Sequence, residues 1–248
     1  RAPRNIDIIK NNQLKFIRSS SASLPATVME KLEDTFNTCV IESYGMTEAT
    51  HQMTSNPLPP NKRKAGSVGL AAGPEVALLL DDKILHNIKE NQNITGQIII
   101  KGENVTEGYI NNPKANSESY IDGWFLTGDE GMFDNDGYLK ITGRLKEIIN
   151  RGGEKISPKE IDEILMEHKS IQQAVAFSVP HEKLGEDLYA AVIIKENEKI
   201  NENNLKEYCQ QRLTQFKIPR KILIVKEIPK GATGKLQRIG LYKKLGIK

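Results

Sequence analysis

The chain has 248 residues, of which 38% are hydrophobic, and it carries 35 basic and 32 acidic side chains. Its length suits one large or two smaller domains, since domains commonly hold about 100–200 residues. The net charge of +3 is small and dispersed, which argues against a nucleic-acid partner. No run approaches the roughly 18 apolar residues of a membrane-spanning helix, so we expect no membrane span.

The first half of the chain predicts an α/β segment followed by a β-rich subdomain. Apolar runs at 14–17 and 39–42 predict buried parallel strands, with a helix between them over 24–36 that has Pro25 in its first turn. From residue 65 the pattern changes to short strands, and Asn135-Asp136-Gly137 is typical of a hairpin turn. The predicted strands cover 76–80, 83–85, 97–101, 124–127 and 139–142.

The rest of the chain predicts a compact α+β domain. Helices are expected over 158–167 and 202–211, and strands over 171–179, 188–195 and 221–225. We therefore expect a mixed α/β and α+β fold. Residues 1–145 would form the end of a large α/β domain (1–64 α/β, 65–145 β-rich), joined at Leu145-Lys146 to a mobile domain over 146–248.

One polar motif, from Ser43 to Glu48, directly follows a predicted buried strand. Ligands of open α/β sheets bind at the carboxyl ends of strands. Tyr44 offers a flat apolar face, Gly45 lets backbone approach a ligand, and Glu48 is a hard oxygen ligand for a phosphate-bound cation. Taken alone, the motif is equally a strand-to-loop turn with an incidental acid.

Three further motifs are candidates for chemistry. Thr127-Gly128-Asp129 places a carboxylate at an expected tight turn, where it could accept ribose hydroxyls or simply cap the turn, and Arg144 could add a charge-assisted contact. Gly152-Gly153 lets backbone come close to a ligand, or merely leads into a helix. Lys235 ends a Gly-framed loop that is no Walker loop, because Leu236 stands where a Ser or Thr is required.

Together, TGDEGMFDNDGYLKITGRLKEIINRGGEKISPKEIDEIL (127–165) and PKGATGKLQR (229–238) resemble the adenylate-forming acyl- and aryl-CoA synthetases. These enzymes activate a carboxylic acid with ATP and transfer it to coenzyme A. The resemblance implies that ATP or AMP, Mg²⁺ and coenzyme A bind. It assigns the nucleotide to Ser43, Tyr44, Gly45, Asp129 and Arg144, the phosphate to Thr47 and the Mg²⁺ to Glu48.

The resemblance also implies a working cycle in two half-reactions. Lys235 would pair with the carboxylate and phosphate while the acid is adenylated. The C-terminal domain would then turn about a hinge at Lys146, and Gly152 and Gly153 would line the path of coenzyme A.

Hydroxyl side chains just before the first predicted helix and an imidazole three residues beyond Glu48 favour a small, polar acid substrate. The text RSSSASLP and ESYGMTEATHQMTSNPLPP looks most like the oxalate–CoA ligase branch, so we expect Ser21, Ser23 and His51 around a distal carboxylate. The alternative is structural: serines cap helices, and a histidine can satisfy a loop carbonyl.

The resemblance covers only the second half of a family member, and the phosphate loop and most of the acyl-binding lobe have no counterpart here. We expect a truncated or processed product that is inactive alone, because phosphate-binding donors are commonly the largest catalytic contribution. The ending Gly246-Ile247-Lys248 is no peroxisomal signal, so we expect a cytoplasmic protein.

Three other functions remain open from the sequence. A medium- or long-chain fatty acid–CoA ligase would need an apolar pocket in the missing lobe. A non-catalytic AMP-binding module would be free to lose its acids and its lysine, yet Glu48, Asp129, Arg144 and Lys235 are all present. A peptide-synthetase adenylation domain shares the motifs, but no carrier segment follows Lys235.

Overall fold

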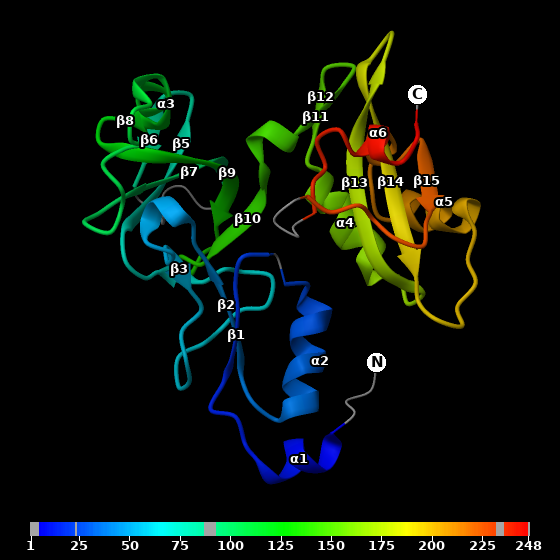
Figure 1. The fold of residues 1–248 in the computed structure, drawn as a ribbon, viewed down its shortest axis with the longest axis horizontal. Coiled ribbons are helices and arrows are strands. Elements are labelled where there is room, and N and C mark those ends of the chain that lie inside the picture. Colours follow the sequence, from blue (N-terminus) through cyan, green and yellow to red (C-terminus); the bar gives the residue numbers. More distant parts are fainter. Residues whose placement is uncertain (1–4, 23, 87–92, 232–235, 248) are drawn as a thin grey trace. The chain divides into compact units, whose positions relative to one another are not determined.

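The computed structural model describes residues 5–22, 24–86, 93–231 and 236–247. The chain forms two compact units, Arg1–Ile141 and Thr142–Lys248 (Figure 1). This division falls a few residues before the expected junction at Leu145-Lys146. No helix in the described part of the chain is long and apolar enough to cross a membrane.

The first unit begins with the β–α–β arrangement that the sequence predicts. Strands β1 (Ile17–Ser19) and β2 (Val40–Tyr44) pair in parallel, and helix α2 (Ala26–Phe36) lies beside them (Figure 1). The helix ends at Asn37, whose φ of 47° takes the chain out of the helical conformation. Because both strands run the same way, their carboxyl ends meet at one edge. Three shorter elements complete this part: α1 (Ile6–Asn11), β3 (Thr54–Ser55) and β4 (Leu70–Ala71).

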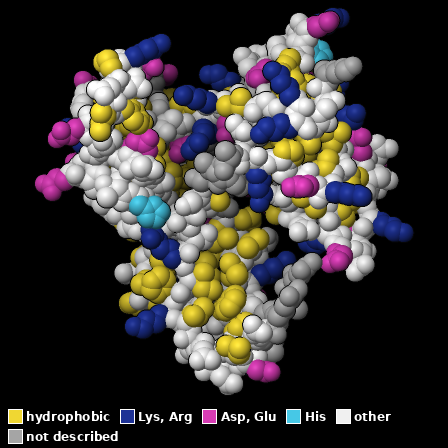
Figure 2. All heavy atoms as spheres, in the orientation of Figure 1, with side chains coloured by type: hydrophobic (Ala, Val, Ile, Leu, Met, Phe, Trp, Pro, Cys, Tyr) yellow, Lys and Arg dark blue, Asp and Glu magenta, His cyan; other side chains and the backbone are white. Residues whose placement is uncertain are grey.

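Hydrophobic side chains gather on the surface where α1, β1 and α2 lie (Figure 2). Ile8 is 62% exposed, Leu14 44% and Phe16 39%. Apolar surface of this kind commonly marks a place that other protein covers.

The rest of the first unit is an antiparallel sheet, as the β-rich pattern predicts. Its strand order is β10-β9-β7-β5-β6, with β8 paired to β9. Side chains on its two faces form separate cores, one around Leu78 and Ile98 and one around Ile99 and Trp124. The elements of this layer are β5 (Glu75–Leu80), β6 (Lys83–Leu85), β7 (Thr95–Lys101), α3 (Pro113–Ser119), β8 (Tyr120–Ile121), β9 (Trp124–Phe133) and β10 (Leu139–Arg144), which continues into the second unit from Thr142.

The prediction of a tight turn at Thr127-Gly128-Asp129 is wrong, because strand β9 continues through these residues. Leu126 pairs with Ile99 and Glu130 with Gln97, so three residues stand opposite Ile98 alone in a bulge. Gly128 has a φ of 74°, and the Thr127 hydroxyl donates to the Ile98 carbonyl at 2.7 Å. A bulge re-aims side chains of the strand, and here Asp129 is one of the residues in the bulge.

The second unit is a sheet with helices packed on it (Figure 1). Its strands follow the order β12-β11-β14-β13, with β15 on β14. One face packs against α4 and α5 through Ala176 and Ala190, and the other packs against α6 through Phe177 and Ala191. The elements are β11 (Ile149–Arg151), β12 (Glu154–Ile156), α4 (Pro158–Glu167), β13 (Ile171–His181), β14 (Gly185–Ile194), α5 (Glu202–Gln210), β15 (Lys221–Ile224) and α6 (Leu241–Lys244), with the 3₁₀ helices η2 (Leu145–Glu147) and η3 (Gln215–Lys217).

A largely buried ionic cluster centres on Arg238 in this unit. Its guanidinium donates to Asp162 Oδ2 at 2.5 Å, to Glu147 Oε2 at 2.9 Å and to the Ala176 carbonyl at 2.9 Å. Although burial disfavours the charged guanidinium, Asp162 and Glu147 raise the pKa of Arg238 above its ordinary value. The cluster therefore joins η2, α4 and β13 to the segment that precedes α6.

The Asp162 carboxyl should make the second unit less stable as the pH rises. Burial raises its pKa from 3.8 to about 6, and Arg238 opposes this rise. The folded chain then holds this proton more tightly than the unfolded chain, so the contribution to stability is complete below about pH 4 and is lost as the pH rises through about 6. Relative to Asp162→Asn, the natural chain should lose on the order of 3 kcal/mol of unfolding free energy over this range.

Native-state amide exchange at Ala176, whose N–H donates to Asp162 at 2.6 Å, would measure this change locally. Glu160→Gln on the same helix is the control and should keep the pH dependence of the natural chain. The same pH dependence in Asp162→Asn as in the natural chain would contradict the prediction.

Candidate functional site

Two of the sequence motifs meet through one hydrogen bond in the first unit. The Tyr44 hydroxyl, at the end of β2, donates to Asp129 Oδ2 of β9 at 2.6 Å. Asp129 is only 5% exposed, and its N–H donates to the Thr127 hydroxyl at 3.1 Å. An aromatic face and a fixed carboxylate, 85 positions apart in the chain, therefore share one location.

The structure gives a different reason for a glycine at position 45 from the close approach to a ligand that the sequence suggested. A Cβ at this position would lie 1.3 Å from the His51 carbonyl oxygen, so any side chain would block the path of the chain. After Gly45 the chain forms the 3₁₀ helix η1 (Thr47–Ala49), and two residues in the left-handed conformation follow, Thr50 (φ 51°) and His51 (φ 83°). Together they reverse the direction of the backbone, so that His51 returns to Gly45. Gly45 thus closes its own loop tightly, and the loop presents Thr47 and His51 to solvent.

Glu48 is held by a partner that sequence reasoning missed. The Tyr109 hydroxyl donates to Glu48 Oε1 at 2.8 Å, and the Thr106 N–H donates to the Glu48 carbonyl at 2.7 Å. Desolvation and the Glu48 carboxylate raise the pKa of Tyr109 to about 12, so this phenol stays a donor. The carboxylate is therefore oriented before any ligand arrives.

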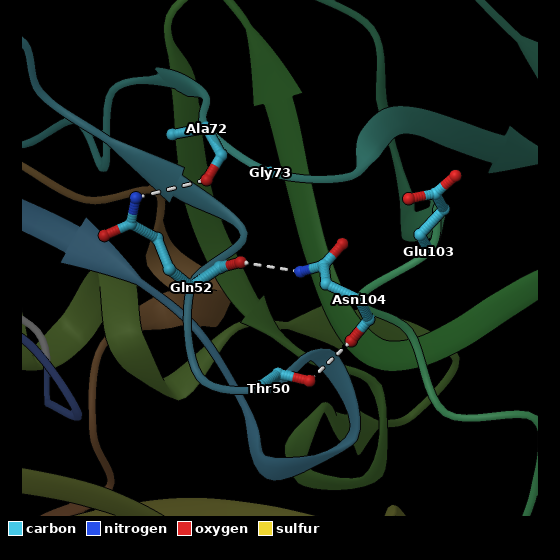
Figure 3. A pocket seen from close by; sticks show the side chains of 6 residues that line it. All are labelled: Thr50, Gln52, Ala72, Gly73, Glu103 and Asn104. Carbon is cyan, nitrogen blue, oxygen red and sulfur yellow. Dashed lines mark hydrogen bonds between the residues drawn. The ribbon is translucent and has the colours of Figure 1, made fainter.

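Beside this loop lies an open pocket of about 470 Å³ (Figure 3). The Asn104 side chain donates to the carbonyls of Ala49 at 2.8 Å and Gln52 at 3.2 Å, and the Asn104 carbonyl accepts from the Thr50 hydroxyl at 2.8 Å. Asn104 therefore fixes the turn that carries His51. The pocket is lined by Thr50, Gln52, Ala72, Gly73, Glu103 and Asn104.

The residues expected around the acid lie in the first unit, so far as the structure describes them. Ser21, with a φ of 71°, and His51 are both exposed. Ser43, which was expected at the nucleotide, is buried. The Ser43 hydroxyl accepts from Arg18 Nε at 2.8 Å, so it is engaged within the chain. Ser23 lies outside the described residues.

The remaining candidates belong to the second unit. Arg144 ends β10, and Lys146 lies exposed in η2. Gly152 and Gly153, with φ of 61° and 97°, form the tip of the β11–β12 hairpin, where sequence had suggested only a loop. Positive φ at both positions is what a two-residue hairpin turn demands. Lys235 lies outside the described residues.

The donor set fits a magnesium ion that is shared with a nucleotide. Within the described ranges, no group of three or more His, Cys, Asp or Glu side chains could hold a metal by itself. Mg²⁺ is commonly held by one or two carboxylates together with substrate phosphates and water. Glu48, oriented by Tyr109, can provide such a carboxylate.

The contacts made by three residues, Arg18, Asn104 and Tyr109, were not predicted because they had no local signal. Tyr109 reaches Glu48 across 61 positions, and Asn104 reaches Gln52 across 52. Nothing in the neighbouring sequence of either residue indicates its partner.

Two models of protein families match this chain, one in each unit. A model described as AMP-binding enzyme matches residues 6–110, and one described as AMP-binding enzyme C-terminal domain matches residues 160–235. The chain belongs to the AMP-binding enzyme family.

Particular relatives agree with this assignment. The chain is 50% identical to an oxalate–CoA ligase of Saccharomyces cerevisiae, covering 91% of this chain and 41% of that protein. It is 49% identical to an oxalate–CoA ligase of Arabidopsis thaliana, with 91% and 43% covered. Among solved structures, ATP-bound MatB of Rhodopseudomonas palustris matches with a TM-score of 0.85 at 27% identity, covering 97% of this chain and 53% of that one. The chain therefore spans less than half of these curated relatives.

The hydrogen bond between Tyr44 and Asp129 should stabilise the first unit. Tyr44→Phe leaves a buried carboxylate without this donor, which should cost roughly 1–3 kcal/mol of unfolding free energy. The only tryptophan of the chain, Trp124, lies in β9 with Asp129, so its fluorescence follows this unit during urea denaturation.

Tyr109→Phe is the matched control, because it also removes a phenol from a carboxylate, but at a more exposed site. Its cost should be clearly smaller. Equal stability of Tyr44→Phe and the natural chain would refute the prediction.

Proposed function

We propose that the protein containing this chain is an AMP-forming acid–CoA ligase. The observation that carries the proposal is the contact between Tyr44 and Asp129, which unites an aromatic face and a buried carboxylate at the carboxyl edge of β2. Family membership and the oxalate–CoA ligase relatives support the same activity.

The first unit would bind the nucleotide. Tyr44 would stack on adenine, with the backbone of Ser43 and Gly45 beside it, and the Asp129 carboxylate would accept hydrogen bonds from the ribose hydroxyls. Arg144 would add a charge-assisted contact to the sugar or the phosphate. This role for Asp129 is compatible with its bond to Tyr44, since a carboxylate has about four acceptor sites.

The phosphates would lie over the loop that Gly45 closes. The Thr47 hydroxyl, which is exposed, would donate to a phosphate oxygen. A magnesium ion held by Glu48 and the nucleotide would neutralise part of the phosphate charge. Tyr109 would keep the Glu48 carboxylate oriented for this purpose.

The reaction would proceed in two steps. A carboxylate oxygen of the acid attacks the α-phosphorus of ATP, forming acyl-AMP and releasing pyrophosphate, with Lys235 pairing with the carboxylate and phosphate. The thiolate of coenzyme A then attacks the acyl carbon, a thioester forms, and AMP leaves. Between the steps the second unit would turn about Lys146, which would withdraw Lys235 and bring the hairpin tip at Gly152 and Gly153 to coenzyme A.

The acid would be small and polar, with oxalate as the leading candidate. Ser21, Ser23 and His51 would surround its distal carboxylate. Two consecutive left-handed residues end at His51, and backbone strain of this kind clusters at functional sites. The cytoplasmic location expected from the sequence stays a prediction.

Pyrophosphate release by the full-length protein across several acids would test the proposed function. We expect strong release with oxalate, little with acetate and none with long-chain fatty acids. The chain described here should release none by itself, because it has no phosphate loop. Release with fatty acids alone would assign the protein to a different ligase and would remove the role of His51.

Lys235→Ala in the full-length protein should slow acyl-AMP formation by at least about 100-fold, since it removes a charge that stabilises the transferring phosphate. Thioester formation from supplied acyl-AMP should be nearly unchanged. Lys230→Ala, which removes an exposed charge from the same segment, is the control and should leave both steps intact. Unaltered adenylation in Lys235→Ala would show that this lysine has no such role.

A further inference from the structure

The guanidinium of Arg18, in β1, is held in place by two hydrogen bonds. Its Nε donates to the Ser43 hydroxyl at 2.8 Å, and its Nη2 donates to Gln52 Oε1 at 2.7 Å. Gln52 is itself fixed, because its Nε2 donates to the Ala72 carbonyl at 3.1 Å (Figure 3). These bonds orient the guanidinium of Arg18, although the residue is exposed.

Both acceptors of Arg18 are neutral. Within the part of the chain that the structure describes, no carboxylate forms an ion pair with Arg18, whereas Arg63 of the same unit pairs with Glu33 at 2.6 Å. Arginine stays charged at any ordinary pH, and its guanidinium has five N–H donors, of which these two bonds use two. A fixed, charged group with donors to spare is suited to bind an anion.

The contacts of Arg18 connect the two segments that carry the candidate residues. Ser43 directly precedes Tyr44, and Gln52 directly follows His51. Arg18 itself is three positions before Ser21, on the strand whose carboxyl end shares an edge with that of β2. A planar guanidinium recognises a carboxylate through two parallel N–H···O bonds.

We propose that Arg18 is a specificity-determining residue that binds the distal carboxylate of a small dicarboxylic acid. This inference rests on the proposed function and adds a permanently charged group to the expected serines and histidine. Gln52 and Ser43 would act as positioning residues for the guanidinium.

The proposal explains how the site would reject acids with apolar tails. An apolar chain at this place would desolvate the guanidinium without giving it an anion, and an unpaired charge removed from water is costly. A site built around a charged partner therefore discriminates more strongly than one that measures size alone.

The test compares Arg18→Gln with the natural full-length protein, using oxalate as the dianionic probe and acetate as the monoanionic probe. Oxalate binding should weaken by roughly 10–100-fold, the range for a hydrogen bond to a charged group. The weakening should appear both in KM for pyrophosphate release and in direct binding by calorimetry. KM for ATP and for acetate should change by less than about twofold, and Arg18→Lys should recover part of the oxalate affinity.

Arg63→Gln is the matched control, since it removes an arginine whose charge is already paired. An unchanged oxalate affinity in Arg18→Gln would overturn the proposal. So would an equal rise of KM for oxalate, acetate and ATP, because a merely structural arginine would act on all three alike. If the natural protein binds oxalate through Arg18 but releases no pyrophosphate, the proposed ligase activity fails and the anion site stands.

Discussion

The hydrogen bond between Tyr44 and Asp129 is the constraint on which the candidate site depends. Tyr44 ends β2 in the sheet that β1 begins, whereas Asp129 belongs to β9 in the neighbouring antiparallel sheet. The ring of Tyr44 also packs against cores from that second sheet, near Leu78 and Phe125. One side chain therefore fixes the position of two sheets within the first unit, and a nucleotide bound there would meet both.

A second layer of contacts keeps the loop after β2 in shape. Gly45 lets the backbone return to His51, Asn104 bonds to the carbonyls on either side, and Tyr109 orients Glu48. Asn104 and Tyr109 both come from the segment after β7. A loop that is tied down in this way needs little rearrangement when it binds a ligand, and preorganised groups bind and stabilise charge more effectively.

In the second unit the ionic cluster around Arg238 has a comparable structural role. It connects Glu147 in η2, next to the proposed hinge, to α4 and β13 in the core. Breaking one partner of a largely buried ionic cluster leaves an uncompensated charge, which is commonly costly. The cluster therefore ties η2 and the segment before α6 to the same core.

The sequence alone determined the elements with strong local signals. Helix α4 begins and ends as predicted because Pro158 occupies its first turn and Ile161 and Leu165 recur on one buried face. Helix α3 was missed because it buries no side chain, although Asn112 and Pro113 mark its start. The motifs that identify the family were likewise visible, since they are short and continuous.

Tertiary structure decided how those motifs work together. The bulge at Gly128 depends on the pairing of β9 with β7, and the bonds made by Arg18, Asn104 and Tyr109 join residues that are far apart in the chain. Local patterns report backbone preference and burial, whereas the partner of a polar side chain is set by which strands become neighbours. Only the folded chain brings the Arg18 guanidinium, which pairs with no carboxylate among the described residues, to the edge where the acid is expected.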